Sequence, residues 1–448
     1  MTEIKKNAWK PKASARERRS WYFYDFGNSA YAAVVLLAVY SAYFKGSVVG
    51  GAEGTRLWGI AVGIAMLLVA VTAPVLGAIA DFAGTKKKVL LFYTAMACFF
   101  TAMLFFVQKG DIVMGMIFFI LAEFAYRSAQ VFYNSLLPDI AHLDEMGHIS
   151  GNGWAIGSLG GIVCLVIVLA AIMLIGGAFV TRLSFVFTAL FFAASAAPLF
   201  LFLKERTEPQ KLPKGENYIS LAFKRIGETF RMVKDHKQFI RFIIAYLIYN
   251  DGIMMTMNFA AIIGAVLFGM QQQELIIFMI VVQVFSVAGA WVFGKMAGKT
   301  GGKRALLVSL TLMILTVLVL MVVQSVPMFY AVGAMAGFAL TGVQSVSRTM
   351  VGQLAPPGKA AEFYGFYSMA GRTSSFIGPT VYGWLTAFLA FRLQNRGVDR
   401  LLAEQIGTRN AVLSIAAFLL VGTVILLFAV NDPTRIGHKQ AEEGSAVE

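Results

Sequence analysis

The feature that most constrains this chain is a series of twelve long apolar blocks that contain few charged residues. Each block is long enough to cross a hydrocarbon core of about 30 Å at about 1.5 Å per residue. Backbone groups in lipid must be hydrogen-bonded within their own segment, so we expect the blocks to be α-helices. The blocks cover residues 22–44, 57–80, 89–107, 112–135, 153–177, 183–203, 239–268, 275–294, 305–323, 327–350, 363–391 and 411–430.

Composition supports an all-α membrane protein. Of the 448 residues, 58% are hydrophobic and 14% are charged, whereas an average soluble domain carries about 25% charged residues. The sequence contains no nucleotide-binding loop, no nucleophile with its base and no paired catalytic carboxylates in a soluble segment. We therefore expect no enzymatic activity, no cofactor and no metal site.

The placement of the basic residues predicts the topology. The net charge is +14, and 26 of the 38 Lys and Arg residues lie in the two tails and in the loops on the same side of the membrane as the tails. Because excess Lys and Arg mark the cytoplasmic face, both termini are predicted to be cytoplasmic. The charge then orients the protein in the lipid bilayer, and no nucleic-acid partner is needed to explain it.

One long cytoplasmic loop divides the spans into six plus six. We expect a basic tail at 1–21, a first six-helix bundle at 22–203, a linker at 204–238, a second bundle at 239–430 and a tail at 431–448. Within the linker, residues 218–236 have apolar residues at helical spacing with Lys and Arg between them. This pattern favours an amphipathic helix on the membrane surface over a regulatory docking site.

An internal repeat supports two pseudo-symmetric bundles. After the second span the chain has Gly77, Asp81, Gly84, Lys86 and Lys87. After the eighth span, Gly294, Gly298, Gly301, Lys303 and Arg304 follow at the same spacing. Weak symmetry between halves is typical of transporters. The second copy has a glycine where the first has its acidic residue.

These residues carry a resemblance to a known family. The pattern Gly-x-x-x-Asp-x-x-Gly-x-Lys-Lys from Gly77 resembles the signature loop of the major facilitator superfamily. More specifically, three segments are similar to the unknown major facilitator family, which is related to the autophagy-associated vacuolar amino-acid effluxers. They are Trp21-Tyr-Phe-Tyr-Asp25-Phe-Gly-Asn28-Ser-Ala30, Phe132-Tyr-Asn134-Ser-Leu-Leu-Pro138-Asp139, and Pro356-Pro-Gly-Lys-Ala-Ala-Glu362-Phe-Tyr-Gly-Phe-Tyr367. The resemblance implies twelve helices in two six-helix bundles around a cavity lined mainly by spans 1, 4, 7 and 10, and transport by alternating access.

Charges inside the spans mark the expected substrate and proton pathway. A charge near the centre of a lone apolar helix costs at least about 2.5 kcal/mol, so it normally faces a cavity or a partner. Glu123 and Arg127 are four residues apart, which places them on one helix face as an ion pair. Either the pair is a static bridge that fixes helix packing, or Arg127 holds an anionic substrate group while Glu123 exchanges between a proton and Arg127.

Asp251 is the corresponding acid of the second half. It lies beside Asn250 and has no cation within four residues on its helix. It is either a substrate or proton group or a packing residue, and Arg372 is the expected cation partner. Gln130, Asn134 and Gln344 are weaker members of the pathway, because such residues more often form interhelical hydrogen bonds than bind ligands.

A second group of residues is expected to form a cytoplasmic gate. Asp25 and Asn28 lie near the inner end of the first span and Arg348 near the inner end of the tenth. The alternative for Asp25 is direct contact with the substrate. The gate also includes the first repeat loop, with Gly77, Asp81, Gly84, Lys86 and Lys87. The loop after span four is acidic, with three acids and two histidines between residues 139 and 148 and no Lys or Arg. We expect it to pair with the basic turn at 86–88. A metal site is the alternative, but the spacing fits no tetrahedral ligand signature.

The combined prediction is a secondary active transporter of a small polar or charged solute, with amino acids or short peptides favoured. We expect proton coupling, a monomer and a bacterial inner membrane location. Two alternatives are an exporter of drugs or other amphipathic compounds, and a receptor or scaffold that does not transport. Two basic residues in the core favour an anionic or zwitterionic solute over an amphipathic drug.

Overall fold

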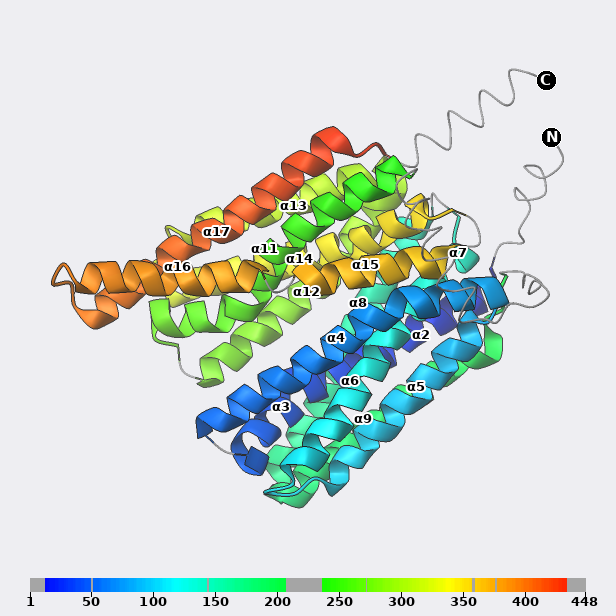
Figure 1. Ribbon diagram of the computed structural model, residues 1–448, viewed down its shortest axis with the longest axis horizontal. Coiled ribbons are helices and arrows are strands. Elements are labelled where there is room, and N and C mark those ends of the chain that lie inside the picture. The colour runs from blue at the N-terminus through cyan, green and yellow to red at the C-terminus, as the bar shows by residue number, and fades with distance from the viewer. Residues whose placement is uncertain are drawn as a thin grey trace.

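The computed structural model is all-helical over the residues it describes, which are 13–49, 51–142, 145–206, 236–270, 272–356, 359–374 and 377–432. The expected amphipathic helix at 218–236 falls outside these ranges except for its last residue, as do residues 1–12 of the first tail and 433–448 of the second. Figure 1 shows the helices in two groups, which we call the first bundle and the second bundle.

The first bundle contains helices up to α9. Its members are α2 (Ala15–Tyr31), α3 (Tyr40–Tyr43), α4 (Gly51–Ala83), α5 (Lys86–Met103), α6 (Ile112–Ser135), α7 (Leu137–Ile140), α8 (Met146–Leu174) and α9 (Gly177–Phe202). Two π-helical segments, Ala32–Ala38 and Phe44–Val49, connect α2 and α3 to α4, and a short 3₁₀ segment, Leu104–Phe106, follows α5.

The second bundle contains α11 to α17. Its members are α11 (Lys237–Phe268), α12 (Gln272–Thr300), α13 (Gly302–Leu320), α14 (Val326–Leu354), α15 (Ala360–Ser374), α16 (Ile377–Gln394) and α17 (Arg400–Ala429). Ten helical segments of the described chain are long and apolar enough to cross a membrane. The helix α4 and the pair α15 and α16 occupy the places of the second and eleventh predicted spans, and the number of twelve spans stays a prediction.

The start of α2 lies earlier than the predicted first span. The predicted span starts at residue 22 because the residues before it are mostly charged or polar, but the helix begins at Ala15. A capping box explains the difference: the Ser14 hydroxyl accepts a hydrogen bond from the Glu17 backbone N–H at 3.2 Å, and the Glu17 carboxylate accepts one from the Ser14 N–H at 2.8 Å. The backbone N–H groups of Ser14 and Glu17, which have no partner within the helix, are thus hydrogen-bonded, so a polar first turn is stable here.

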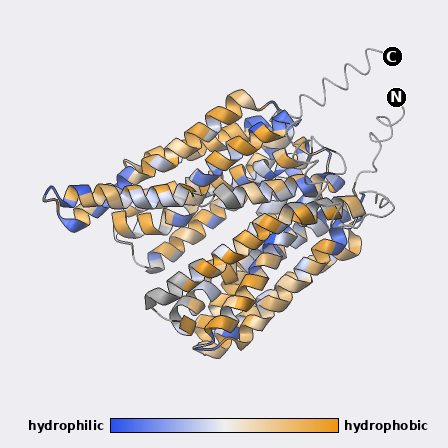
Figure 2. Cartoon of the chain, viewed as in Figure 1, coloured by the Kyte–Doolittle hydropathy of each residue, from blue (hydrophilic) through white to orange (hydrophobic). Residues whose placement is uncertain are grey.

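The outer surface is apolar along the helices. Large exposed side chains such as Leu67, Phe92, Ile117 and Leu420 lie on it. Figure 2 shows hydrophobic residues along the length of both bundles and hydrophilic residues concentrated toward the ends. An apolar surface of this extent suits contact with lipid tails rather than water.

The two bundles meet along two helix pairs, in which α8 packs against α12 and α15 packs against α4. Gly147 and Gly151 of α8 allow the first contact, because an added Cβ would collide with Ala297 or with the backbone of Ala290 and Gly294. These residues lie near the start of α8 and the end of α12. We call this end of the molecule the closed end.

Both ends of the described chain lie at the closed end. Near the start of α2, Arg18 pairs with Glu145 just before α8 at 2.7 Å. At the other end of the chain, Asp432 packs against Gly301, which follows α12. In Figure 1 the bundles lie close together near α7 and splay apart toward the opposite end.

The glycine seam generates a stability prediction. Gly151→Ala should lower the free energy of unfolding by about 1–3 kcal/mol, the usual cost of an overpacked contact, because the new methyl meets the α12 backbone. Gly63→Ala on α4 is the matched control, since its Cβ would have no neighbour within 4 Å. Thermal unfolding in detergent should show a lower Tm for Gly151→Ala only, and equal Tm values for the two variants would contradict the seam.

Candidate functional site

An ion pair lies within α6, in the middle of the first bundle. The Arg127 Nε donates to Glu123 Oε1 at 2.6 Å. The Glu123 side chain is fully buried, whereas the Arg127 side chain is 22% exposed. The carboxylate is therefore sealed from the surroundings while part of the guanidinium remains accessible.

Aromatic residues surround this pair. The Tyr31 and Tyr126 rings stack with centroids 4.4 Å apart, and the guanidinium of Arg127 lies 5.1 Å from the Tyr126 ring centroid. One turn further, the Gln130 side-chain amide donates to the Tyr126 hydroxyl at 3.0 Å. The second carboxylate oxygen of Glu123 is buried and accepts no hydrogen bond from the described residues. An accessible guanidinium beside an incompletely bonded carboxylate can bind an anionic group and exchange a proton.

Asp251 of α11 is also buried, in the second bundle. Its Oδ1 accepts a hydrogen bond from the Gly378 backbone N–H of α16 at 3.1 Å, and a Cβ at Gly378 would collide with the Asp251 side chain. The neighbouring Asn250 amide donates to the Gly371 carbonyl at 3.4 Å. The side chain of Arg372, the expected partner of Asp251, lies outside the described side chains, so this pairing stays a prediction.

Among the described residues, Arg348 of α14 makes an extensive set of polar contacts between the bundles. Its Nε donates to the Ser150 hydroxyl at 2.9 Å, and one terminal nitrogen donates to the Ser150 carbonyl at 2.6 Å. The other terminal nitrogen lies 3.5 Å from Asp25 Oδ2 and 3.4 Å from Asn134 Oδ1. A side chain of the second bundle thus bonds to α2, α6 and α8 of the first bundle.

Three aromatic rings complete the surroundings of this guanidinium. Its central carbon lies 4.9 Å from the Trp21 ring, 5.6 Å from Trp154 and 5.9 Å from Tyr133. Trp21 and Tyr133 stack with centroids 4.5 Å apart, and the Trp21 indole N–H donates to the Tyr133 carbonyl at 3.1 Å. We call Trp21, Tyr133, Trp154, Asp25 and Ser150 the arginine cage. The Arg348 backbone is also held, because the Tyr364 hydroxyl donates to the Arg348 carbonyl at 2.7 Å.

The first repeat loop lies at the closed end of the first bundle. Gly84 has a positive φ of 57°, which favours glycine at this turn. Lys86 is buried, with its Nζ 4.0 Å from Asp139 Oδ2, so the acidic loop and the basic turn do meet at this pair. Gly77 is buried in α4, and the side chain of Asp81 is not among those described.

Glu205, which the sequence pattern does not single out, caps the start of α5. Its two carboxylate oxygens accept from the backbone N–H groups of Lys86 at 2.8 Å and Lys87 at 3.1 Å. The Lys87 ammonium donates to the Leu203 carbonyl at 2.7 Å. Burial raises the pKa of the Glu205 carboxyl against the opposing effect of these bonds. The segment that follows α9 is thereby fixed to the basic turn.

The remaining predicted residues are Asn28 of α2 and Gln344 of α14. Asn28 is buried one turn after Asp25 on α2, and its side-chain carbonyl accepts no hydrogen bond from the described residues. Gln344 is partly buried on α14, directly before Ser345. The Ser345 carbonyl accepts from the Ser150 hydroxyl at 2.9 Å, which adds a further hydrogen bond between α14 and α8 to the two that Arg348 makes.

Comparison with known proteins identifies the family. The profile of the family described as "Vacuole effluxer Atg22 like" matches residues 57–387. The chain belongs to the Atg22-like family. Among curated proteins, the chain is similar to the uncharacterized MFS-type transporter YxiO of Bacillus subtilis, which is 27% identical over 432 residues covering 94% of this chain and 96% of that protein. Autophagy-related protein 22-1 of Penicillium rubens is 25% identical over 260 residues, covering 53% of this chain and 44% of that protein.

Solved structures show the fold of this Atg22-like chain. The human organic anion transporter MFSD10 has a TM-score of 0.68 at 13% identity, over 92% of this chain and 100% of the other. A bacterial homologue of the iron transporter ferroportin in an outward-facing state has a TM-score of 0.67 at 12% identity, over 92% of this chain and 99% of the other. The proton:xylose symporter XylE has a TM-score of 0.64 at 11% identity, over 93% of this chain and 95% of the other. These structures agree in fold with the family match and with the similarity to YxiO, which identify the protein as a multi-pass MFS-type transporter; its family and fold are those of transporters rather than enzymes.

The arginine cage generates a prediction about access to the closed end. Ser345 is fully buried between the bundles, whereas Ser309 is fully buried inside the second bundle, where it donates to the Ala339 carbonyl. We expect Arg348→Ala to expose Ser345→Cys to a membrane-impermeant thiol reagent, because the bonds that join α14 to α2, α6 and α8 are lost.

The control for this experiment is Ser309→Cys in the same Arg348→Ala protein, with Cys98 and Cys164 replaced by alanine. It should stay unlabelled, since opening of the closed end does not open the second bundle. Equal labelling of Ser345→Cys with and without Arg348 would contradict a role for the cage in closing this end.

Proposed function

We propose that this protein is a secondary active transporter that moves a small polar or charged solute by alternating access and is coupled to protons. The favoured substrates are amino acids or short peptides. The proposal includes twelve spans in two bundles, at 22–203 and 239–430, with both termini on the cytoplasmic side of a bacterial inner membrane. The closed end is then the cytoplasmic end.

The ion pair of Glu123 and Arg127 is the observation that carries this proposal. A charge pair in the middle of a helix is costly in lipid and is normally retained for a task. The guanidinium is partly accessible while the carboxylate is buried beneath it. A substrate carboxylate that binds Arg127 would weaken its attraction for Glu123, which would then take up a proton more readily.

The buried Asp251 gives the second bundle a group of the same kind. Among the described residues, its carboxyl group accepts a hydrogen bond from a backbone N–H, which can accompany either the ionised or the protonated acid. Asn250 lies beside it on α11. The proposed pathway also includes Gln130 and Asn134 of α6 and Gln344 of α14, so both bundles contribute polar groups to it. The proposed role of Arg372 is to neutralise Asp251 in part of the cycle.

The arginine cage is the proposed cytoplasmic gate. Arg348 and Asp25 form the centre of this gate, Asn28 lies one turn further along α2, and the first repeat loop with Lys86 paired to Asp139 forms its edge. Opening this end would require the guanidinium to leave the cage, and Ser150 and Asp25 would then need water or other partners. The family description as effluxers supports transport of the solute out of a compartment.

The substrate-binding role of Arg127 has a direct test. A thermal-shift screen of the purified protein against amino acids, short peptides and sugars at two pH values first identifies a stabilising compound. Arg127→Gln should then abolish both the shift and the uptake of that compound by proteoliposomes while expression is retained, because the anion-binding group is lost.

The matched control is Arg392→Gln, which removes an exposed charge at the far end of α16. It should transport like the wild type. If Arg127→Gln also transports normally, the pair is a packing element and the proposed site is wrong.

Proton coupling is tested separately with Glu123→Gln and Asp251→Asn. At least one of these variants should keep exchange of labelled for unlabelled substrate but lose accumulation driven by a pH gradient, because the neutral amide carries no proton. A membrane potential of 100 mV supplies about 2.3 kcal/mol per charge moved. Wild-type transport that responds to neither a pH gradient nor a membrane potential would contradict the coupling.

A further inference from the structure

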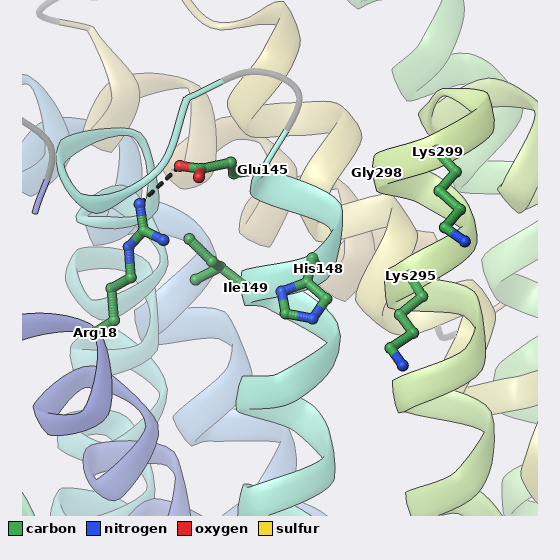
Figure 3. A pocket seen from close by; sticks show the side chains of 7 residues that line it. All are labelled: Arg18, Glu145, His148, Ile149, Lys295, Gly298 and Lys299. Atoms are coloured by element: carbon green, nitrogen blue, oxygen red, sulfur yellow. Dashed lines mark hydrogen bonds and ion pairs between the residues drawn. The ribbon is translucent and has the colours of Figure 1, made fainter. Parts of the chain in front are cut away.

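A basic cavity lies at the closed end, outside the ion pair and the arginine cage. It has a volume of about 400 Å³. Its lining comes from α2, from the start of α8 and from the last turns of α12, so both bundles contribute to it (Figure 3). The lining residues are Arg18, Glu145, His148, Ile149, Lys295, Gly298 and Lys299.

The cavity carries a net positive charge. Arg18 is paired with Glu145 at 2.7 Å, which neutralises both. Lys295 and Lys299 form no ion pair with the described residues, and Lys295 Nζ instead lies 3.5 Å from the Trp291 ring centroid. His148 is exposed on α8, the helix that faces α12 across the seam (Figure 3). Two ammonium groups and an imidazole are thus left to bind an anion.

The internal repeat shows why no acid balances these lysines. Gly298 occupies the position in the second repeat loop that Asp81 occupies in the first. A carboxylate at 298 would face the same cavity as Lys295 and Lys299. Gly298 also serves the seam, because its backbone N lies against the position of a Cβ at Gly147. The departure from the repeat therefore leaves the cavity basic.

Beyond the cavity, exposed and partly exposed residues continue along α8 and α12, and most of them are apolar. Residues at spacings of three and four run from it along one face of each of the two helices. On α12 they are Lys299, Lys295, Trp291, Ala288 and Val284, and on α8 they are His148, Asn152, Ile156, Leu159 and Val163. Trp291 is 48% exposed, as expected of an aromatic side chain at the level of lipid headgroups. Basic groups therefore lie directly above two apolar stripes.

We propose that this cavity binds the phosphate of an anionic phospholipid. Lys295 and Lys299 would bind the phosphate oxygens and His148 would donate a further hydrogen bond, while the acyl chains lie along the exposed faces of α8 and α12. A phosphate suits two ammonium groups, and the apolar stripes below them favour a lipid over a free anion.

A lipid in this position bridges the two bundles. Lys295 and Lys299 belong to the second bundle, and His148 belongs to the first, on the opposite side of the glycine seam. Separation of α8 from α12 would divide the cavity, so the lipid binds the closed form more tightly and shifts the equilibrium toward it. This preference rests on the proposed alternating access, whereas lipid binding itself does not.

The test measures lipid retained by the purified full-length protein. Native mass spectrometry with phosphatidylglycerol, phosphatidylcholine or inorganic phosphate distinguishes an anionic lipid from a neutral lipid and from a free anion. The cavity variant is Lys295→Gln with Lys299→Gln. The control variant is Lys88→Gln with Lys237→Gln, which removes the same charge from exposed positions at the closed end but outside the cavity.

We expect the wild type and the control variant to retain phosphatidylglycerol in preference to phosphatidylcholine. The cavity variant should bind phosphatidylglycerol at least about tenfold more weakly, on the scale expected for two basic residues at a membrane surface. Equal retention by all three proteins would overturn the proposal, and so would binding of inorganic phosphate without a preference for the anionic lipid. Because the readout is lipid binding, failure of the proposed transport function would leave this result unchanged.

Discussion

The arrangement of the closed end depends on one guanidinium group that crosses from one bundle into the other. Arg348 is held by the Ser150 hydroxyl and carbonyl and faces Asp25, and its side chain is only 5% exposed. Removal of one partner from a buried charge pair typically costs about 3–5 kcal/mol. The cage can therefore hold the bundles together firmly. Because this free-energy cost applies as soon as the pair is broken, we expect the closed end to open in an all-or-none transition. The glycines of α8 and α12 allow these two helices to pack closely at the same end of the molecule.

The internal charges fall into groups with different surroundings. Arg348 and Asp25 are enclosed by aromatic rings and join two bundles, whereas Glu123 and Arg127 belong to one helix and leave the guanidinium partly accessible. Asp251 is held by a backbone amide of the second bundle. A static scaffold needs only the first kind of interaction. The accessible guanidinium and the two acids within the bundles are what the proposed transport cycle uses, and the proposed role of the cage is to keep one end closed.

Local features of the structure follow from the sequence, and distant contacts do not. Apolar runs of about 20 residues are a local property, so the helices fall close to the predicted spans. The pairing of Glu123 with Arg127 follows from a spacing of four on one helix. The early start of α2 could have been found from the Ser-x-x-Glu pattern at Ser14. By contrast, Ser150 is 198 residues from Arg348, and no periodicity indicates that Trp21, Tyr133 and Trp154 would surround it. The capping role of Glu205 depends likewise on how α9 ends beside α5.

The measurement that tests this account most directly is the distance between the bundles at the closed end. Spin labels at Lys88 of α5 and Lys237 of α11 occupy exposed positions on different bundles, and double electron–electron resonance reports their separation. The account predicts that a short distance dominates in the wild type and that Arg348→Ala adds a population at longer distance. A single unchanged distance in both proteins would contradict the claim that this guanidinium holds the closed end together.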